Sequence, residues 1–346
     1  MAVTRRALLR GGLTVTAVGA LGATVADTAA ATGTRAVTRP RMYGCAEWGA
    51  RRPNGTIEVL NRKPTYIVVH HTAGANSTDT SLAHAFSISR GIQNFHMDTR
   101  GWIDSGQQLT NSRGGYITEG RHRSLEALDG GTRHVLGAHV GNHNSETIGI
   151  ENEGLYSTVD VTPRLWDSLV HLVAYIAQQY GISPTMIRGH RDFNATECPG
   201  TVLYGRLPEL REAVADAIGS PVSEVETWPL LKPGDRGPKV LAAQHLLRAR
   251  GAAEVVADGV FGPATFAAVQ RLARAGGVAY EPCYASRTAD ESGYVGVTTW
   301  PLLVRTVPVG EASEVGRAAR VLLSARRERV GPGHVIDQPG WRRLLG

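Results

Sequence analysis

Cysteine, aromatic residues and lysine are all scarce in this chain of 346 residues. Three cysteines cannot build a disulfide framework, so the chain is not a small disulfide-stapled protein. Aromatic residues make up only 6% of the chain, and the core therefore has to rely on valine, leucine, isoleucine and alanine. Strongly apolar runs long enough to span a membrane are also missing, which excludes a membrane transporter.

The charge balance is closer to ordinary. Hydrophobic residues make up 42% and charged residues 20%, as in a globular protein, and this excludes a disordered or fibrous chain. The formal net charge is +6, and arginine supplies nearly all of the positive charge because only three residues are lysines. The surplus is scattered rather than gathered in a dense stripe, which favours an anionic polymer surface over nucleic acid. Twelve histidines are the first indication of metal or acid–base chemistry.

The length predicts two or three domains, preceded by an export signal at residues 1–31. Arg5 and Arg6 precede a mildly apolar stretch at residues 11–26, and the small residues 28–31 suit cleavage by a signal peptidase. The paired arginines resemble a Tat-type signal, so we expect a secreted protein with no stable membrane insertion. The alternative interpretation of this segment is a disordered basic terminus.

Residues 42–218 carry the pattern of an α/β domain. The β-branched run at residues 65–70 predicts a buried strand that ends at a histidine pair, and residues 147–153 predict a second strand. Residues 81–92 predict a short amphipathic helix, and residues 95–107 a hairpin. Strands interleaved with helices favour a covered sheet.

The clearest helix of this block follows Thr162, which is expected to be its N-cap, with Pro163 at the first helical position. Gly181 is expected to end it. Its apolar face is predicted to consist of Leu165, Leu169, Leu172, Val173 and Ile176.

A polar linker at residues 219–226 leads to a repeat. The string Thr-Trp-Pro-Leu-Leu occurs at residues 227–231 and again at residues 299–303, and each copy precedes a helix-like stretch, at residues 240–250 and 315–326. A third, weaker echo lies at residues 341–345. We therefore predict a small all-α module at residues 227–304 and a degenerate second copy at residues 305–346.

Two segments far apart in the sequence offer ligands for a metal ion. His70 and His71 lie at the end of the first predicted strand, and His190 and Cys198 lie eight residues apart in a loop. Imidazole nitrogen and thiolate sulfur both suit Zn²⁺, and catalytic zinc sites commonly use three protein ligands. The alternative is that the His–Cys pair is merely structural.

The motifs in residues 42–215 together resemble those of the amidase-2/peptidoglycan recognition protein family. They are Glu-Trp-Gly-Ala-Arg at residues 47–51, Val-Val-His-His-Thr-Ala at 68–73, Gly-Ala-His at 137–139, Thr-Ile-Gly-Ile-Glu-Asn-Glu-Gly at 147–154 and the segment 189–200. The resemblance implies that family's mixed central sheet covered by helices. It also implies a zinc-dependent N-acetylmuramoyl-L-alanine amidase. His70, His190 and Cys198 would hold one zinc ion per chain, with His71 as a packed neighbour or, alternatively, a ligand.

The resemblance also assigns the acid–base and groove residues. Glu151 matches the general base of some bacterial amidases, and Glu153, on the same strand face, is expected to be a solvated charge, although the two roles could be exchanged. Thr196 is expected to help to stabilise the oxyanion. Residues His139 and Asn144 fall in the family's substrate groove, with a structural histidine as the alternative for the first. Gln93 stands where many relatives have a tyrosine, and we expect it to contact substrate without proton chemistry.

Residues 232–240, 258–265 and 297–300 resemble the helical peptidoglycan-binding module of cell-wall hydrolases. Together with the first resemblance this implies a wall-associated monomer whose partner is peptidoglycan. The alternative is a receptor or sensor of the same fold that has lost hydrolysis, and a less specific one is an adhesin for anionic polymers. The remaining cysteines, Cys45 and Cys283, could pair or stay as two separate thiols, because the sequence gives no geometry.

Overall fold

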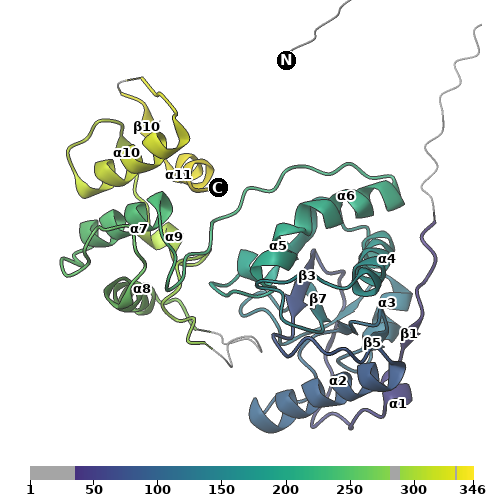
Figure 1. Cartoon of the computed structure of the whole chain (residues 1–346). Coiled ribbons are helices and arrows are strands. Elements are labelled where there is room, and N and C mark those ends of the chain that lie inside the picture. The colour runs from purple at the N-terminus through teal and green to yellow at the C-terminus, as the bar shows by residue number, and fades with distance from the viewer. Residues whose placement is uncertain (1–35, 281–288, 332) are drawn as a thin grey trace, which may run out of the picture. The chain divides into compact units, whose positions relative to one another are not determined.

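The computed structural model describes residues 36–280, 289–331 and 333–346 (Figure 1). The predicted export signal and Cys283 lie outside these ranges. The two largest hydrophobic clusters among the described residues lie in different parts of the chain, one built from residues between Met42 and Ile218 and the other from residues between Trp228 and Leu345. None of the described helices is long and apolar enough to cross a membrane.

The first part of the chain is built on a mixed six-stranded sheet with the strand order β1-β5-β4-β7-β3-β8. Only the β4–β5 pair is antiparallel within this sheet. Its strands are β1 (Met42–Tyr43), β3 (Tyr66–His71), β4 (Leu109–Asn111), β5 (Ile117–Glu119), β7 (Thr147–Asn152) and β8 (Ile187–Gly189). A separate two-stranded pair consists of β2 (Val59–Leu60) and β6 (His134–Val135). The expected mixed sheet covered by helices is confirmed.

Helices of the same part of the chain surround the sheet (Figure 1). The α-helices are α1 (Cys45–Trp48), α2 (Leu82–Asn94), α3 (Ser124–Gly130), α4 (Pro163–Tyr180), α5 (Thr201–Gly205) and α6 (Leu207–Ile218). Shorter turns of other helix types are η1 (Phe95–Thr99), η2 (Pro184–Met186) and η3 (His190–Asp192).

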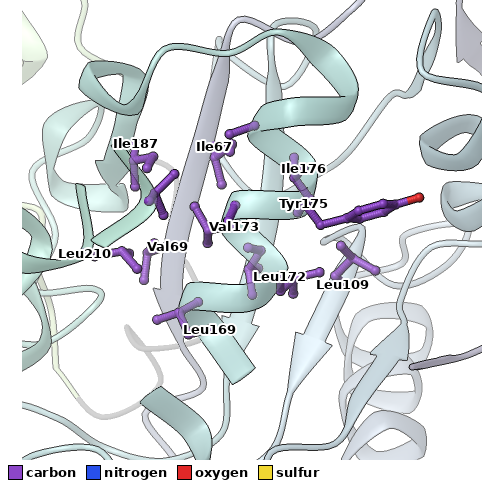
Figure 2. Close-up of a cluster of buried hydrophobic side chains, with 14 of the residues drawn as sticks. Ile67, Val69, Leu109, Leu169, Leu172, Val173, Tyr175, Ile176, Ile187 and Leu210 are labelled. Atoms are coloured by element: carbon purple, nitrogen blue, oxygen red, sulfur yellow. The ribbon is translucent and has the colours of Figure 1, made fainter. Parts of the chain in front are cut away.

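Helix α4 shows why this sequence forms a layered fold. The Thr162 hydroxyl accepts a hydrogen bond from the backbone N–H of Leu165, and Gly181 ends the helix in the left-handed region, as the sequence predicted. The predicted apolar face of α4 is fully buried. It packs against Ile67 and Val69 of β3, as Figure 2 shows.

Strand alternation then divides β3 between two environments. Ile67 and Val69 face α4, so Val68 and His70 point to the opposite face of the sheet. The parallel register pairs Val68 with Gly149 and His70 with Glu151. That opposite face, at the ends of β3 and β7, is where the polar side chains gather.

The hairpin predicted at residues 95–107 is wrong. Residues Phe95–Thr99 form the π-helical turn η1, which continues directly from α2, so His96 and Met97 are buried by helical geometry and not by strand alternation. The antiparallel pair lies later, between β4 and β5, with Gly115 in the left-handed region of its turn.

The second part of the chain is mainly helical, as predicted, with one short strand pair. Its elements are α7 (Pro238–Ala249), α8 (Pro263–Ala275), α9 (Trp300–Leu303), β9 (Val307–Pro308), α10 (Glu314–Arg326), β10 (Val335–Ile336) and α11 (Gln338–Leu345). The repeated string is helical only in its second copy, since residues 228–230 form no helix or strand. The tryptophans Trp228, Trp300 and Trp341 are all buried in one cluster, so they act as core residues.

Buried His96 makes the stability of the first part depend on pH. Burial lowers the pKa of His96 to about 3, whereas the unfolded chain keeps a value of about 6.5. Below pH 6.5 the His96 ring is therefore protonated in the unfolded state but stays neutral in the folded state. The free energy of unfolding is unaffected by this group above pH 6.5 and falls as the pH drops toward 3. Between pH 6.5 and 5 the loss is about 2 kcal/mol.

We expect His96→Asn to flatten this dependence. The Nδ1 atom of His96 accepts a hydrogen bond from the backbone N–H of Gly106 at 3.0 Å, and the asparagine carbonyl oxygen can replace it without titrating. Urea unfolding at several pH values between 7.5 and 5 measures the slope. Equal slopes for the two proteins would show that His96 does not titrate as described.

Candidate metal centre

Three side chains meet at one end of the sheet. His70 is the last residue of β3 on its side of the sheet. His190 begins η3 directly after β8, and Cys198 lies in the loop that follows η3. Each residue is only 1% exposed. One nitrogen of each histidine and the Sγ atom of Cys198 all lie within 4.8 Å of one another, and the group could hold a metal ion.

One distance within this group matches the separation of two ligands on a tetrahedral zinc ion. The Nδ1 atom of His70 lies 3.5 Å from the Sγ atom of Cys198. Two ligands bound to Zn²⁺ at about 2.0–2.3 Å in a tetrahedral arrangement lie about 3.5 Å apart. The backbone N–H of His71 also donates to Sγ, at 3.4 Å, which favours a negatively charged sulfur.

His190 presents a lone pair that no described protein group uses. Its Nε2 atom donates to the Oδ1 atom of Asn194 at 3.1 Å, so its Nδ1 atom carries no hydrogen. This Nδ1 atom is buried and makes no hydrogen bond within the described residues. A buried acceptor without a donor is unfavourable, and a metal ion at this position would satisfy it.

The side chain of His71 points away from the group that could hold a metal. It points to the opposite sheet face from His70, and its Nδ1 atom accepts a hydrogen bond from the backbone N–H of Tyr156 at 3.3 Å. It is absent from the group that could hold a metal. The sequence left His71 open as an alternative ligand, and the structure places it as a packed neighbour.

Glu151 stands next to His70. The two residues are register partners in the parallel β3–β7 pair, so their side chains leave the same face of strands that lie about 4.8 Å apart. Thr110 of β4 is the register partner of Glu151 on its other side. Glu151 is 6% exposed, so its side chain is buried at this end of the sheet.

Comparison with known proteins identifies the family of this chain. A family profile described as N-acetylmuramoyl-L-alanine amidase matches residues 60–201. Peptidoglycan-recognition protein SC2 of Drosophila melanogaster is 32% identical over 174 residues, which cover 50% of this chain and 88% of the relative. The chain belongs to the peptidoglycan-recognition protein/N-acetylmuramoyl-L-alanine amidase family.

Other members and one solved structure are similar at lower identity. The N-acetylmuramoyl-L-alanine amidase of Sus scrofa is 29% identical over 170 residues, which cover 49% of this chain and 27% of the relative. The structure of wild-type Drosophila PGRP-LB is 28% identical, covers 48% of this chain and 92% of its own, and superposes with a TM-score of 0.43. The profile match lies within the part of the chain that holds the sheet.

Gln93 does not fit the substrate contact expected of it. Its Oε1 atom accepts from the backbone N–H of Arg51, and its Nε2 atom donates to the Arg51 carbonyl and to Asp104. The residue is 1% exposed. These bonds join α2 to the segment after α1 and to Asp104, so Gln93 is left out of the proposed site.

Asn144 and His139 also bond within the protein. The Oδ1 atom of Asn144 accepts from the backbone N–H groups of His139 and Val140, at 2.7 and 2.9 Å. Asn144 thus braces the loop before β7. The ring of His139 lies against His70 rather than apart from the metal group, at 3.0 Å between Nδ1 of His139 and Nε2 of His70.

Glu153 differs most from its expected role. It is 1% exposed, and its carboxylate accepts from the Nε2 atom of His84 at 2.8 Å and from the backbone N–H of Arg113 at 2.9 Å. The expectation of a solvated charge is therefore wrong, because α2 and the β4–β5 turn cover the end of β7 and both donate to this residue.

One polar residue near Glu151 was missed by the sequence analysis. Gln107 is 1% exposed and donates through Nε2 to the hydroxyl of Thr110 at 2.9 Å, while its Oε1 atom makes no hydrogen bond within the described residues. Its only sequence signal is a pair of glutamines directly before a short strand.

Thr196, which is expected to stabilise the oxyanion, lies two residues before Cys198. Its hydroxyl oxygen accepts a hydrogen bond from the backbone N–H of Cys198 at 3.2 Å.

Proposed function

We propose that this protein is a zinc-dependent amidase that hydrolyses the bond between N-acetylmuramic acid and L-alanine in bacterial peptidoglycan. The observation that supports it best is the buried group of His70, His190 and Cys198, in which the Nδ1 atom of His190 is buried and makes no hydrogen bond within the described residues. Membership of the family places the chain among amidases and peptidoglycan-recognition proteins, and the intact ligand set favours the amidases.

The three residues would hold one zinc ion per chain. Zinc bound there would act as a Lewis acid that polarises the scissile carbonyl and activates water near neutral pH. The backbone N–H of His71 would steady the thiolate of Cys198, and Asn194 would hold the ring of His190.

Glu151 is proposed as the general base. Its carboxylate would take a proton from the attacking water and return it to the leaving amine of L-alanine, which is the role of a positioned acid–base group. Its place beside His70 in the register supports this assignment. The Thr196 hydroxyl is proposed to assist the oxyanion from the loop that also carries Cys198.

The proposal is tested by zinc content and product release from one preparation. Purified protein should contain about one zinc per chain and should release free stem peptides from purified cell walls, with new amino termini on L-alanine. Wall binding without peptide release would favour the non-catalytic receptor instead. Release of sugar fragments only would indicate a different bond and would contradict the proposal.

We further propose that the helical part at residues 227–346 attaches the exported enzyme to the wall and raises the local substrate concentration. Deletion of residues 228–346 should leave a folded enzyme, because residues 42–218 have their own hydrophobic cluster. We expect near-normal cleavage of soluble muropeptides and at least several-fold weaker binding to insoluble walls in a sedimentation assay. Equal sedimentation of the two proteins would contradict the anchoring role.

A further inference from the structure

His139 makes a contact that the proposed mechanism does not use. Its Nδ1 atom lies 3.0 Å from the Nε2 atom of His70, on the side of the His70 ring away from Cys198. The two rings are nearly perpendicular, at 81°. This is the geometry of a hydrogen bond from one ring nitrogen to the other, and its direction depends on which ring carries the hydrogen.

The neighbouring groups determine that direction. The hydroxyl of Thr147 donates its hydrogen to the backbone carbonyl of His143 at 2.9 Å, and a carbonyl can only accept. The same hydroxyl oxygen lies 3.4 Å from the Nε2 atom of His139 and must therefore accept from it. With its hydrogen on Nε2, neutral His139 has a lone pair on Nδ1.

The tautomer of His139 also determines the tautomer of His70. Since Nδ1 of His139 accepts, Nε2 of His70 donates, and the lone pair of His70 is on Nδ1, the atom 3.5 Å from Cys198. We propose that His139 is a positioning residue that holds His70 in the one neutral tautomer able to bind the metal, before the metal arrives. This inference rests on the proposed zinc site and adds a residue to it.

Two glycines leave room for the ring of His139 beside β7. A Cβ atom at Gly149, in the middle of β7, would lie 2.6 Å from Nδ1 of His139, and one at Gly137 would lie 2.5 Å from its Cδ2 atom. Glycine is a poor residue for a strand interior, so its use at position 149 is explained by the ring that packs on it. The two glycines leave a slot that the imidazole fills.

His190 shows the same device with a different partner. Its Nε2 atom donates to Asn194, which leaves Nδ1 for the metal. Outer partners of this kind fix ring orientation and tautomer in metal sites, and their loss commonly weakens metal binding about 10–100-fold. In this chain a histidine occupies the place where a carboxylate or carbonyl is the usual partner.

The test compares His139→Phe with His139→Asn. Phenylalanine keeps a flat ring in the slot but has no acceptor, whereas the asparagine carbonyl oxygen can stand close to the position of Nδ1. Nitrogen-15 NMR of the ring nitrogens in zinc-free full-length protein at pH 7.5 reads the tautomer directly. We expect a single Nε2–H tautomer of His70 in the wild type and in His139→Asn, and a mixture in His139→Phe.

Zinc affinity, measured by competition with a chelator, supplies the second readout. We expect the zinc dissociation constant to rise about 10–100-fold in His139→Phe and to stay within about threefold in His139→Asn. The His190 ring is an internal control, because Asn194 should keep its tautomer unchanged in both variants. A His139→Phe protein with a single His70 tautomer and wild-type zinc affinity would overturn the inference.

A second variant and the zinc-free tautomer cover the cases in which His139→Phe does not fold or the wild type binds no zinc. If His139→Phe does not fold, His139→Ala removes the acceptor without overfilling the slot and carries the same expectation. If the wild type binds no zinc, the proposed function fails, but the tautomer of His70 in the zinc-free protein still decides the role of His139. A mixed His70 tautomer in the wild type would overturn that role.

Discussion

Replacement of Cys198 by serine is expected to reduce bound zinc from about one ion per chain to nearly none after dialysis, and to abolish amide cleavage. A neutral hydroxyl is a much weaker ligand than a thiolate, and the two histidines alone do not make a closed site. Loss of the metal removes several kcal/mol of transition-state stabilisation, which corresponds to a fall of about 10³-fold or more in rate.

Cys45 offers a matched control for this substitution. It is also a buried cysteine, but its Sγ atom donates to the backbone carbonyl of Gly120 at 3.5 Å, and a serine hydroxyl can do the same. Cys45→Ser should therefore keep both zinc and activity. Elemental analysis and peptide release measured on both variants decide the point. A Cys198→Ser protein that retains one zinc and cleaves walls would remove Cys198 from the ligand set.

The second large effect is expected for Glu151→Gln. No proposed ligand is altered, so zinc content should stay near one per chain, while kcat should fall about 10²–10⁴-fold through loss of the acid–base group. Steady-state kinetics on a soluble muropeptide measure kcat and KM separately. Near-normal turnover by zinc-loaded Glu151→Gln would exclude this residue as the base.

Glu153→Gln provides the contrasting variant. Its carboxylate accepts from both His84 and the backbone N–H of Arg113, and an amide can accept from only one of them without placing its own NH₂ against the other donor. We expect a loss of about 1–3 kcal/mol in the free energy of unfolding, with kcat retained in the folded protein. The two glutamates should thus separate: Glu151 affects turnover, and Glu153 affects stability.

The sequence predicts those elements whose signals are local. Helix α4 carries its cap, its first-turn proline, its apolar face and its terminal glycine within twenty residues, and all four features are present. Strands β3 and β7 have strand-like sequences because both are buried on both faces. The register that joins them, which sets His70 beside Glu151, has no local signal.

The errors arise where burial depends on partners that are distant in the sequence. Glu153 receives one of its hydrogen bonds from a histidine 69 residues away, and Gln93 is buried by contacts with Arg51, 42 residues away. A charged or amide side chain at the end of a strand or helix looks solvated until such partners are known. The sequence of the turn η1 also fits a strand, because helical and extended burial cannot be told apart over five residues.

The wide separation of the candidate ligands along the sequence has a consequence for the stability of the fold. His70 and Cys198 are 128 positions apart, and the segment between them includes most of the sheet and helix α4. A metal bound to both ends would act as a cross-link and close that segment into a ring. A cross-link of this span lowers the entropy of the unfolded chain by the equivalent of about 4–5 kcal/mol at room temperature. The ion that serves catalysis would therefore also hold together a domain whose cysteines are too few to do so with disulfides.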